Sequence, residues 1–450
     1  MFAVLLLAGS AYAIAQTLVA PAIPEITRRY EASPAAVSWL LTGFLLAAAI
    51  ATPIAGKLGD VHGRGKVLAA VMLIYAAGSV ICALSPTIGP MIGGRVLQGV
   101  SGGVYPLAYA VIKETFPAEK VAFGLSMVSV LVGLGAAAGL AMAGPIVEHL
   151  GVSWLFWTGL VGLPTALGAL WLIPSRPAAA GTTIDWRGAA LLSAALSCVL
   201  LAITRANEWG WDSPPTVGLF VAGVAIAALW LRLERHTRQP LIELRLLRTR
   251  TMLAVNLGSL LFGFVTFTGF LLIPQLAHAD EATGYGLGFT VAGAGLVVLP
   301  LAFCQFAAGP LAARVGGRIG FRSTLIIGAA TCSSSLLLLA LAHDRLAGLL
   351  VGGGLIGAGV AFAFAGAANL VVDAVPAGDV GIATGINTVA RAVGSAFGTA
   401  VATAILTSDL QPSTGLPTSS AYTIAFAVAA ATGLLSLLCS LAIPRGLGAR

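Results

Sequence analysis

The chain has 450 residues, of which 58% are apolar and only 9% are charged. Soluble domains carry about 25% charged residues, so this composition excludes a soluble protein and indicates an integral membrane protein. The net charge of +7 would suit a nucleic-acid partner, but the positions of the basic residues explain it otherwise. The five cysteines lie in apolar stretches without metal-ligand spacing, so we expect no disulfide, no metal site and no cofactor.

Long apolar segments recur along the whole chain. They predict an all-α membrane protein with fourteen spans, because a spanning helix needs about 20 apolar residues. The predicted spans lie at 2–24, 36–55, 67–84, 88–111, 121–147, 153–173, 188–204, 214–231, 252–275, 288–312, 323–342, 346–372, 382–407 and 421–443. The seventh and eighth are the shortest and could instead form a re-entrant hairpin, although the flanking tryptophans and arginines favour two full spans.

The lysines and arginines orient these spans. With both termini in the cytoplasm, most of the 24 basic residues fall in cytoplasmic loops, and the outer loops carry only Arg28, Arg29, Arg205 and Arg345. This is the asymmetry of the positive-inside rule, and it explains the net charge without a nucleic-acid partner. The basic segment 232–250 is then a cytoplasmic linker, expected to lie on anionic lipid headgroups. Low cysteine use and compact loops are compatible with a bacterial inner membrane.

A stretch rich in glycine and charge separates the second and third spans, at 56–66. Lipid cannot satisfy the backbone of a loop, so we expect a tight turn in water or in a protein crevice. Its pattern is glycine, leucine, aspartate, glycine, arginine and lysine at Gly56, Leu58, Asp60, Gly63, Arg64 and Lys66. This pattern resembles the signature loop of major facilitator superfamily transporters, although Val61 stands where a basic residue is usual.

That resemblance implies the major facilitator fold and a gating role for the loop. Asp60 and Arg64, with Gly56 and Gly63, would lock the cytoplasmic ends of two helical bundles together in one state and release them in the other. The alternative is a turn that is basic only because cytoplasmic turns usually are.

A degenerate copy of the pattern follows the tenth span. Residues 309–318 align with 56–65, and the aspartate is replaced by Ala313. Both stretches follow the second span of their half, so two related six-helix halves with an inserted helix pair are the simplest account. Gly309 and Arg314 are then gating residues of the second half. The chain divides into an N-terminal bundle, an inserted hairpin with its basic linker, and a C-terminal bundle, at 1–174, 175–250 and 251–450.

Two arginines, Arg95 and Arg391, fall well inside predicted spans, where a charge costs about 2.5–3.5 kcal/mol on insertion scales. The sequence Arg95-x-x-Gln98-Gly99 resembles a motif that major facilitator drug–proton antiporters carry in the fourth span. The resemblance implies proton coupling through Arg95 and Gln98, which share one helical face, together with Asp60. The alternative is an arginine bonded to backbone carbonyls across the bundle.

The fifth span is rich in small residues, with Gly135, Gly139, Gly144 and Pro145 among alanines. It resembles the glycine-rich antiporter motif of the same transporters, with its Gly-Pro step displaced. The spacing of Gly135 and Gly139 lets helices approach closely, and plain packing explains these two glycines equally well.

The first span narrows the resemblance to a subfamily. The stretch 16–24 resembles the signature of the fourteen-span drug–proton antiporters, although Ala15 and Ala20 stand where that signature has aspartate and asparagine. Similar matches in the second and thirteenth spans, at 39–46 and 385–394, extend the resemblance over nearly the whole chain.

The missing aspartate bears on the substrate, because a desolvated cation needs a buried carboxylate. The predicted substrate cavity would instead offer arginine, amide and aromatic groups, from Gln16, Trp39, Asn256, Gln275, Gln305, Asn369, Asn387, Arg391 and Arg95. We therefore expect an anionic, zwitterionic or neutral amphiphile rather than a lipophilic cation. Arginine does not deprotonate in proteins, so the proton carrier would be Asp60, Glu25, Glu114 or the substrate itself.

The function favoured by these residues is a secondary active transporter that exports amphiphilic small molecules in exchange for protons. A proton-coupled symporter or facilitator for an organic anion is the alternative, and a non-transporting receptor is a remote one. The sequence has no Gly-x-x-x-x-Gly-Lys-Ser/Thr loop, so we expect no ATP as partner. The five histidines are unclustered and lie in predicted loops, which argues against an enzyme.

Overall fold

The computed structural model describes residues 1–174, 184–237, 240, 244–376, 378–411 and 415–444. Within these ranges the chain folds into helices, and one isolated β-bridge joins Leu410 to Pro417. The N-terminal helices are α1 (Phe2–Thr17), η1 (Ala20–Ala22), α2 (Ile23–Tyr30), α3 (Pro34–His62), α4 (Arg64–Leu84), α5 (Ile88–Gly99), η2 (Val100–Gly103), α6 (Val104–Thr115), α7 (Ala118–His149), α8 (Val152–Trp157), η3 (Thr158–Val161) and α9 (Gly162–Leu172).

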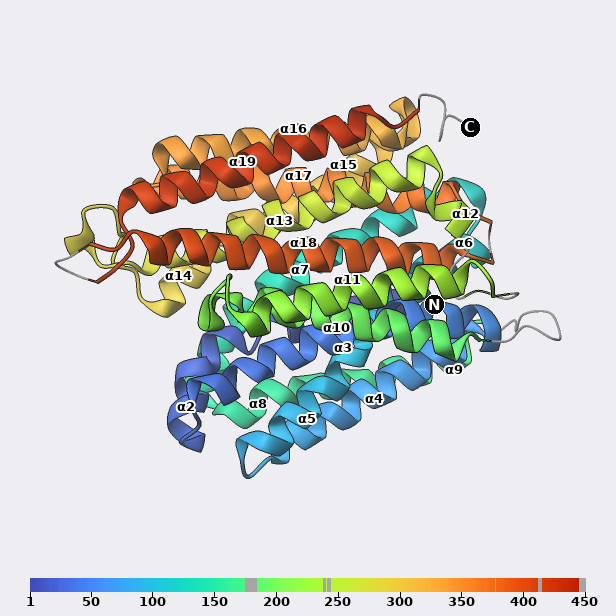
Figure 1. Ribbon diagram of the computed structural model, residues 1–450, viewed down its shortest axis with the longest axis horizontal. Coiled ribbons are helices and arrows are strands. Elements are labelled where there is room, and N and C mark those ends of the chain that lie inside the picture. Colours follow the sequence, from blue (N-terminus) through green and yellow to red (C-terminus); the bar gives the residue numbers. More distant parts are fainter. Residues whose placement is uncertain (175–183, 238–239, 241–243, 377, 412–414, 445–450) are drawn as a thin grey trace.

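A helical hairpin and a second set of helices follow. The hairpin consists of α10 (Trp186–Trp209) and α11 (Pro214–Glu234). The C-terminal helices are α12 (Leu244–Leu247), α13 (Arg250–His278), η4 (Glu281–Thr283), α14 (Val291–Val297), α15 (Leu299–Ile319), α16 (Phe321–Ala342), α17 (Leu346–Asp373), α18 (Val380–Ser408) and α19 (Ser419–Leu441). The N-terminal and C-terminal helices form two halves, and α10 and α11 lie at the boundary between them (Figure 1).

The long helices have the length and composition of membrane spans. In the described part of the chain, 13 helices are long and apolar enough to cross a membrane. The fourth predicted span is instead a broken run of α5, η2 and α6, so the fourteen-span topology stays a prediction. Both hairpin helices are longer than the sequence indicated, with 24 residues in α10 and 21 in α11. They qualify as two full spans by length rather than as a short re-entrant pair.

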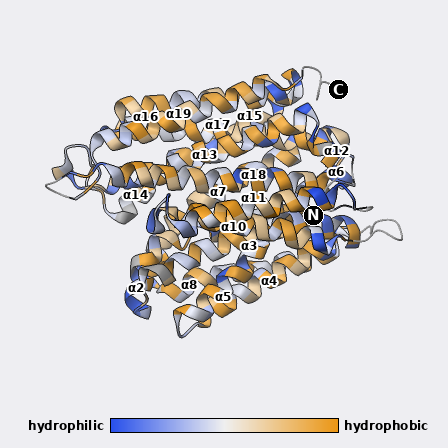
Figure 2. Cartoon of the chain, in the orientation of Figure 1, coloured by the Kyte–Doolittle hydropathy of each residue, from blue (hydrophilic) through white to orange (hydrophobic). Residues whose placement is uncertain are grey.

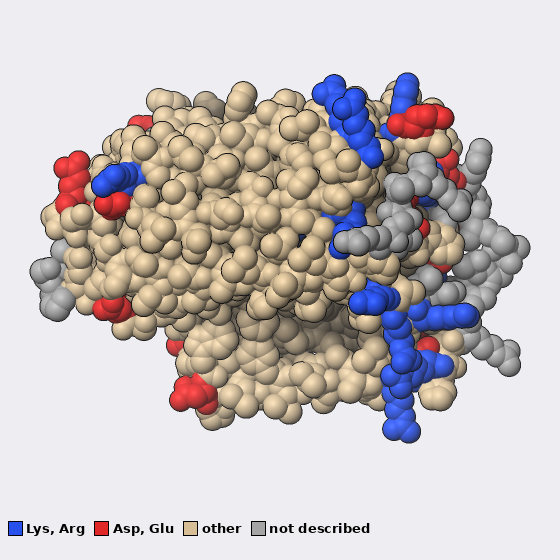
Figure 3. All heavy atoms as spheres, turned by 90° about the horizontal axis from the view of Figure 1, so that it is seen from above, with Lys and Arg blue, Asp and Glu red and all other residues tan. Residues whose placement is uncertain are grey.

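The surface has the pattern of a protein embedded in lipid. Apolar residues cover the long middle parts of the helices, and polar residues gather near their ends (Figure 2). The view in Figure 3 shows Lys, Arg, Asp and Glu at the two ends and a broad band between them without these residues. We call the end of the molecule where α1 begins and α19 ends the basic end, since Lys57, Arg64, Lys66, Lys113 and Lys120 lie there.

The turn expected over 56–66 is confined to Gly63, and the predicted extent of the loop is wrong. Helix α3 continues to His62 and α4 begins at Arg64, so Gly63 alone interrupts the helices, with φ +96°. Glycine suits this position because it adopts positive φ without steric cost. An α-helix satisfies its backbone hydrogen bonds internally. Residues 56–62 can therefore be helical although they include charged residues and glycines.

The register of the second copy is also different from the predicted one. Residues 309–318 lie entirely within α15, and the hinge between α15 and α16 is Gly320, with φ +85°. If the two hinge glycines are aligned with each other, Gly63 pairs with Gly320. The sequence alignment instead paired Gly63 with Gly316, four residues earlier. Four residues are about one helical turn, and the glycines of both stretches repeat at that interval, so the sequence could not distinguish the two registers.

Candidate functional site

A cavity of about 430 Å³ lies between the two halves. Its wall comes from α1, α3, α6 and α7 on one side, from α13, α17 and α18 on the other, and from α10 of the hairpin. Thr52 and Thr388 line the part of the cavity nearest the basic end, while Glu208 and Thr403 line it near the ends of α10 and α18 that are opposite the basic end. The lining is largely apolar, with hydroxyl, amide and aromatic groups among alkyl side chains. Such a lining suits an amphiphilic ligand.

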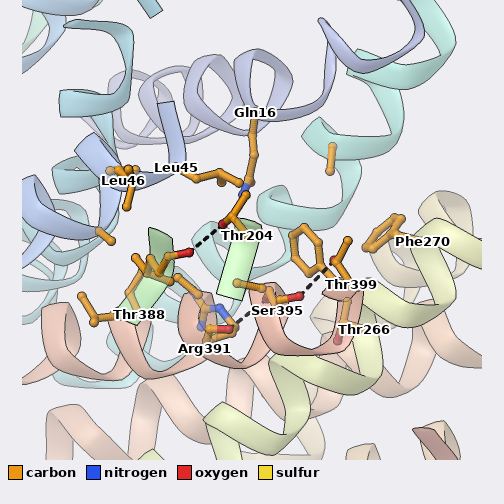
Figure 4. A pocket seen from close by; sticks show the side chains of 18 of the residues that line it. Gln16, Leu45, Leu46, Thr204, Thr266, Phe270, Thr388, Arg391, Ser395 and Thr399 are labelled. Atoms are coloured by element: carbon orange, nitrogen blue, oxygen red, sulfur yellow. Dashed lines mark hydrogen bonds between the residues drawn. The ribbon is translucent and has the colours of Figure 1, made fainter. Parts of the chain in front are cut away.

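Arg391 of α18 supplies a positive charge to this cavity. Its guanidinium stands 4.5 Å from the ring centroid of Phe364, and no carboxylate of the described residues forms an ion pair with it. Tyr12 and Tyr105, whose ring centroids are 5.5 Å apart, also line the cavity. Figure 4 shows Gln16 and Arg391 projecting toward the pocket from opposite sides. An unneutralised cation beside aromatic faces can bind the acidic group of an amphiphile.

The two halves touch closely at the basic end. A Cβ atom added to Gly56 of α3 would lie 2.6 Å from the carbonyl oxygen of Gly381 in α18. Only glycine fits such an approach of two backbones. Nearby, Lys113 Nζ of α6 lies 3.5 Å from Asp373 Oδ1 of α17, an ion pair between the halves. The cavity is therefore separated from the basic end by packed helices.

Asp60 and Arg64 lie at this contact. Arg64 Nη2 donates to Asp60 Oδ1 at 3.1 Å, and its Nη1 donates to Glu114 Oε2 at 2.9 Å and to the carbonyl of Ala110 at 2.6 Å. The second carboxylate oxygen, Asp60 Oδ2, faces the first turn of α18, where an added Cβ on Gly381 would lie 3.1 Å from it. A carboxylate at the N-terminus of a helix is electrostatically favourable.

The second-half residues Gly309 and Arg314 are placed differently. Gly309 packs against α7, since an added Cβ would lie 2.5 Å from Val130 Cγ2. Arg314 is exposed. Neither lies at the hinge, because Gly320 comes about three helical turns after Gly309 and nearly two turns after Arg314.

Arg95 is buried inside the N-terminal half and does not line the cavity. Its Nε donates to the carbonyl of Leu40 at 2.9 Å, and its Nη1 donates to the carbonyl of Ala15 at 3.0 Å and to Gln98 Oε1 at 2.8 Å. The ring centroid of Phe44 lies 4.2 Å from the guanidinium. These contacts match the structural alternative, an arginine bonded to backbone carbonyls across the bundle.

The predicted glycine contacts of the fifth span are present between α7 and α1. An added Cβ on Gly135 would lie 2.5 Å from Ala13 Cβ, and one on Gly139 would lie 2.3 Å from Thr17 Oγ1. Around Gly144 nothing lies within 4 Å of an added Cβ. Helix α7 therefore lies close to α1 at Gly135 and Gly139, whereas Gly144 has open space beside it.

Most of the amides predicted for the substrate cavity bind other protein groups. Asn387 Nδ2 donates to Asn256 Oδ1 at 3.0 Å, linking α18 to α13. Asn369 donates to a carbonyl of its own helix, and Gln275 is exposed at the end of α13. Gln305 is fully buried between α15 and α7. Of the predicted cavity residues, Gln16 and Arg391 line the cavity, and Trp39 lies next to its wall.

The hairpin contributes residues that the sequence reasoning missed. Thr204, Asn207 and Glu208 of α10 line the cavity, although the seventh span was predicted to end at residue 204. Helix α10 continues to Trp209, so Arg205, predicted to lie in an outer loop, is a buried helical residue. The spacing of Arg205 and Glu208, three residues apart next to a glycine C-cap, is the signal that could have extended the helix.

The fold and the cavity define a class: a polytopic membrane transporter whose two halves enclose a central site. The model of the Major Facilitator Superfamily matches residues 5–302 and 257–446. The chain belongs to this superfamily, as the resemblance of its motifs predicted, and it is a transporter rather than an enzyme.

Relatives with stated activities are similar over most of the chain. The tetracenomycin C resistance and export protein of Streptomyces glaucescens is 31% identical over 383 residues, which are 83% of this chain and 69% of that protein. The multidrug resistance protein Stp of Mycobacterium tuberculosis is 27% identical over 373 residues, covering 82% and 68%. The crystal structure of the human organic anion transporter MFSD10 (TETRAN) covers 98% of both chains with a TM-score of 0.69 and 16% identity, which shows a shared fold.

Proposed function

We propose that this protein exports amphiphilic small molecules across a bacterial cytoplasmic membrane in exchange for protons, with neutral or anionic compounds favoured over cationic ones. The observation that carries the proposal is the largely apolar cavity between the halves, in which Arg391 forms no ion pair with a carboxylate of the described residues. The export and resistance activities named for the relatives support the direction. The basic end is the cytoplasmic end in this proposal, by the positive-inside rule.

Transport would proceed by rocking of the segments 1–174 and 251–450 about the cavity, with the hairpin of 175–250 at their boundary. The close contact of Gly56 with Gly381 supports a state that is closed to the cytoplasm. Gating is assigned to Gly56, Asp60, Gly63 and Arg64, with Gly309 and Arg314 as candidates in the second half.

Proton coupling is assigned to Asp60, Arg95 and Gln98. The burial of Arg95 away from the cavity favours an indirect part, in which it holds α1 and α3 in place rather than carrying the proton.

Proton flux in everted membrane vesicles tests the function. A pH gradient is established, a pH-sensitive dye reports its size, and matched anionic, neutral and cationic amphiphiles are added one at a time. We expect anionic or neutral compounds to dissipate the gradient in vesicles with the wild-type chain, and Arg391→Gln to abolish the response to anions. A response to cations alone would contradict the charge preference.

A proton-coupled symporter or facilitator for an organic anion is the second candidate, favoured by the same Arg391. Addition of an anion would then move protons in the direction of the substrate, or leave the gradient unchanged. The sign of the dye response therefore separates the two functions.

A further inference from the structure

The inserted hairpin gives the cavity a carboxylate. Among the described residues that line the cavity, Glu208 is the one acidic side chain. It lies in the last turn of α10, which ends at Trp209. Asp60, Glu114 and Glu25, the carboxylates considered from the sequence, are absent from this lining.

The surroundings of Glu208 turn its negative charge toward the cavity. Its Oε2 accepts a hydrogen bond from Arg205 Nη1 at 2.5 Å. The Arg205 side chain is 5% exposed and that of Glu208 is 47% exposed, and the guanidinium is covered by the indole of Trp39 at 5.2 Å. No described residue bonds Glu208 Oε1. A ligand in the cavity therefore meets the carboxylate, while the guanidinium that orients it is shielded.

Contacts to both halves hold this part of the hairpin in place. Asn207 Nδ2 donates to the carbonyl of Ala400 in α18 at 3.0 Å, and Trp211 Nε1 donates to Asn207 Oδ1 at 3.0 Å. Arg205 stacks on Trp39 of α3 in the other half. The carboxylate is thus fixed beside the cavity rather than carried on a loose loop.

The cavity therefore has charges of opposite sign at two levels. Arg391 and Ala400 lie on α18 and both line the cavity. Because Asn207 bonds the carbonyl of Ala400, Ala400 gives the position of Asn207 and its neighbour Glu208 along the α18 axis. Nine residues of α-helix span about 13 Å along the axis. An anionic end and a cationic end, separated by roughly that distance, face one enclosed volume.

We propose that Glu208 and Arg391 form a dipolar substrate site that binds zwitterionic amphiphiles, with the ammonium group of the substrate at Glu208 and its anionic group at Arg391. Each charge leaves water only when it meets a partner of opposite sign, and the lining between the two ends is largely apolar. This inference rests on the proposed transport function and assigns the hairpin a part in substrate recognition.

Binding of three ligands of equal chain length tests the site: 11-aminoundecanoic acid, undecanoate and undecylammonium. Their extended lengths are similar, and the zwitterion places its charges at opposite ends. Each is titrated by calorimetry into the full chain in nanodiscs, with empty nanodiscs as the blank. We expect the zwitterion to bind more tightly than either singly charged ligand.

Variants of Glu208 and Arg391 test the two charged ends of the proposed site separately. Glu208→Gln is expected to weaken binding of the zwitterion about tenfold, because one charge-assisted hydrogen bond is lost. The affinity of this variant for undecanoate should stay within about twofold of the wild-type value. Arg391→Gln is expected to weaken the zwitterion and undecanoate alike. Asp212→Asn is the matched control, because this exposed carboxylate lies on the same hairpin but outside the cavity lining.

The outcomes are distinct. Retained undecanoate binding by Glu208→Gln shows that the variant is folded, so a loss confined to the zwitterion supports the site. An unchanged affinity for the zwitterion in Glu208→Gln overturns the dipolar site and leaves the export of anions standing. A wild-type chain that binds none of the three ligands overturns the site, while the vesicle assay with other amphiphiles still decides the function.

Discussion

At the scale of single residues, Arg95 and Arg391 illustrate how one sequence signal leads to two environments. Each is a charge within an apolar run. In the fold, Arg95 is 1% exposed and donates to two backbone carbonyls and to Gln98. Arg391 instead faces the cavity beside Phe364. The first arginine stabilises the packing of its half, and the second is available to a ligand.

The two arginines should therefore differ in their contribution to stability. Arg95→Ala removes three charge-assisted hydrogen bonds and leaves a buried amide oxygen unpaired, so we expect it to lower the free energy of unfolding by about 3 kcal/mol or more. Arg391→Ala removes mainly a cation–π contact, with an expected loss of about 1 kcal/mol. Thermal unfolding of the purified variants in detergent measures both. Equal losses would contradict the assignment of different roles.

Asp60 offers a second test at this scale. Asp60→Asn weakens the favourable interaction of a carboxylate with the first turn of α18, so the contact between the halves at the basic end should open more readily. We expect a cysteine introduced at the cavity position Thr52 to react with a membrane-impermeant maleimide from the basic-end side about three to ten times faster, an effect of about 1 kcal/mol. Glu119→Gln, an exposed site in the first turn of α7, should leave the rate unchanged.

At the scale of elements, the close approach of α7 to α1 depends on glycine residues, which have no side chain at the contact. An added Cβ on Gly139 would lie 2.6 Å from the carbonyl oxygen of Ile14 as well as 2.3 Å from Thr17 Oγ1. Backbone cannot retreat as a flexible side chain can, so the helices would have to separate. Helix α10 is in addition attached to both halves by polar side chains, since Asn207 donates to the carbonyl of Ala400 and Arg205 lies against Trp39.

Two glycine substitutions in α7 should have opposite signs. Gly139→Ala is expected to destabilise the fold by about 1–3 kcal/mol, because the added methyl group overpacks the contact with α1. Gly144→Ala, with open space around the new methyl group, should stabilise the helix by about 0.5–1 kcal/mol through the higher helix propensity of alanine. The difference in midpoint of thermal unfolding checks the pair, and a shift of the same sign in both would refute the packing argument.

At the scale of the whole molecule, the two halves meet closely at the basic end and enclose a cavity further along. The ion pair of Lys113 with Asp373 and the contact of Gly56 with Gly381 join α6 to α17 and α3 to α18. A rocking motion of the halves would have to break both contacts. The arrangement therefore predicts that transport depends on separation at this end.

Cross-linking the halves tests that dependence. In a chain whose native cysteines are replaced by alanine, Lys113→Cys and Asp373→Cys are joined by a short thiol-specific cross-linker. We expect transport to stop on cross-linking and to return when a reducible linker is cleaved, whereas either single cysteine treated in the same way retains transport. Undiminished transport by the cross-linked chain would show that this end need not open.

The sequence alone determined the class of protein, the superfamily, the approximate limits of the helices and the two intramembrane arginines, because these depend on local composition and on motifs. The tertiary structure decided which polar groups meet the cavity. A helix that is apolar on every side has no amphipathic pattern from which the side facing the cavity can be predicted. Asn387 was for this reason assigned to the cavity, although in the structure it bonds Asn256. The same holds for Glu208: only the packing of α10 against both halves brings this carboxylate into the cavity that Arg391 also lines.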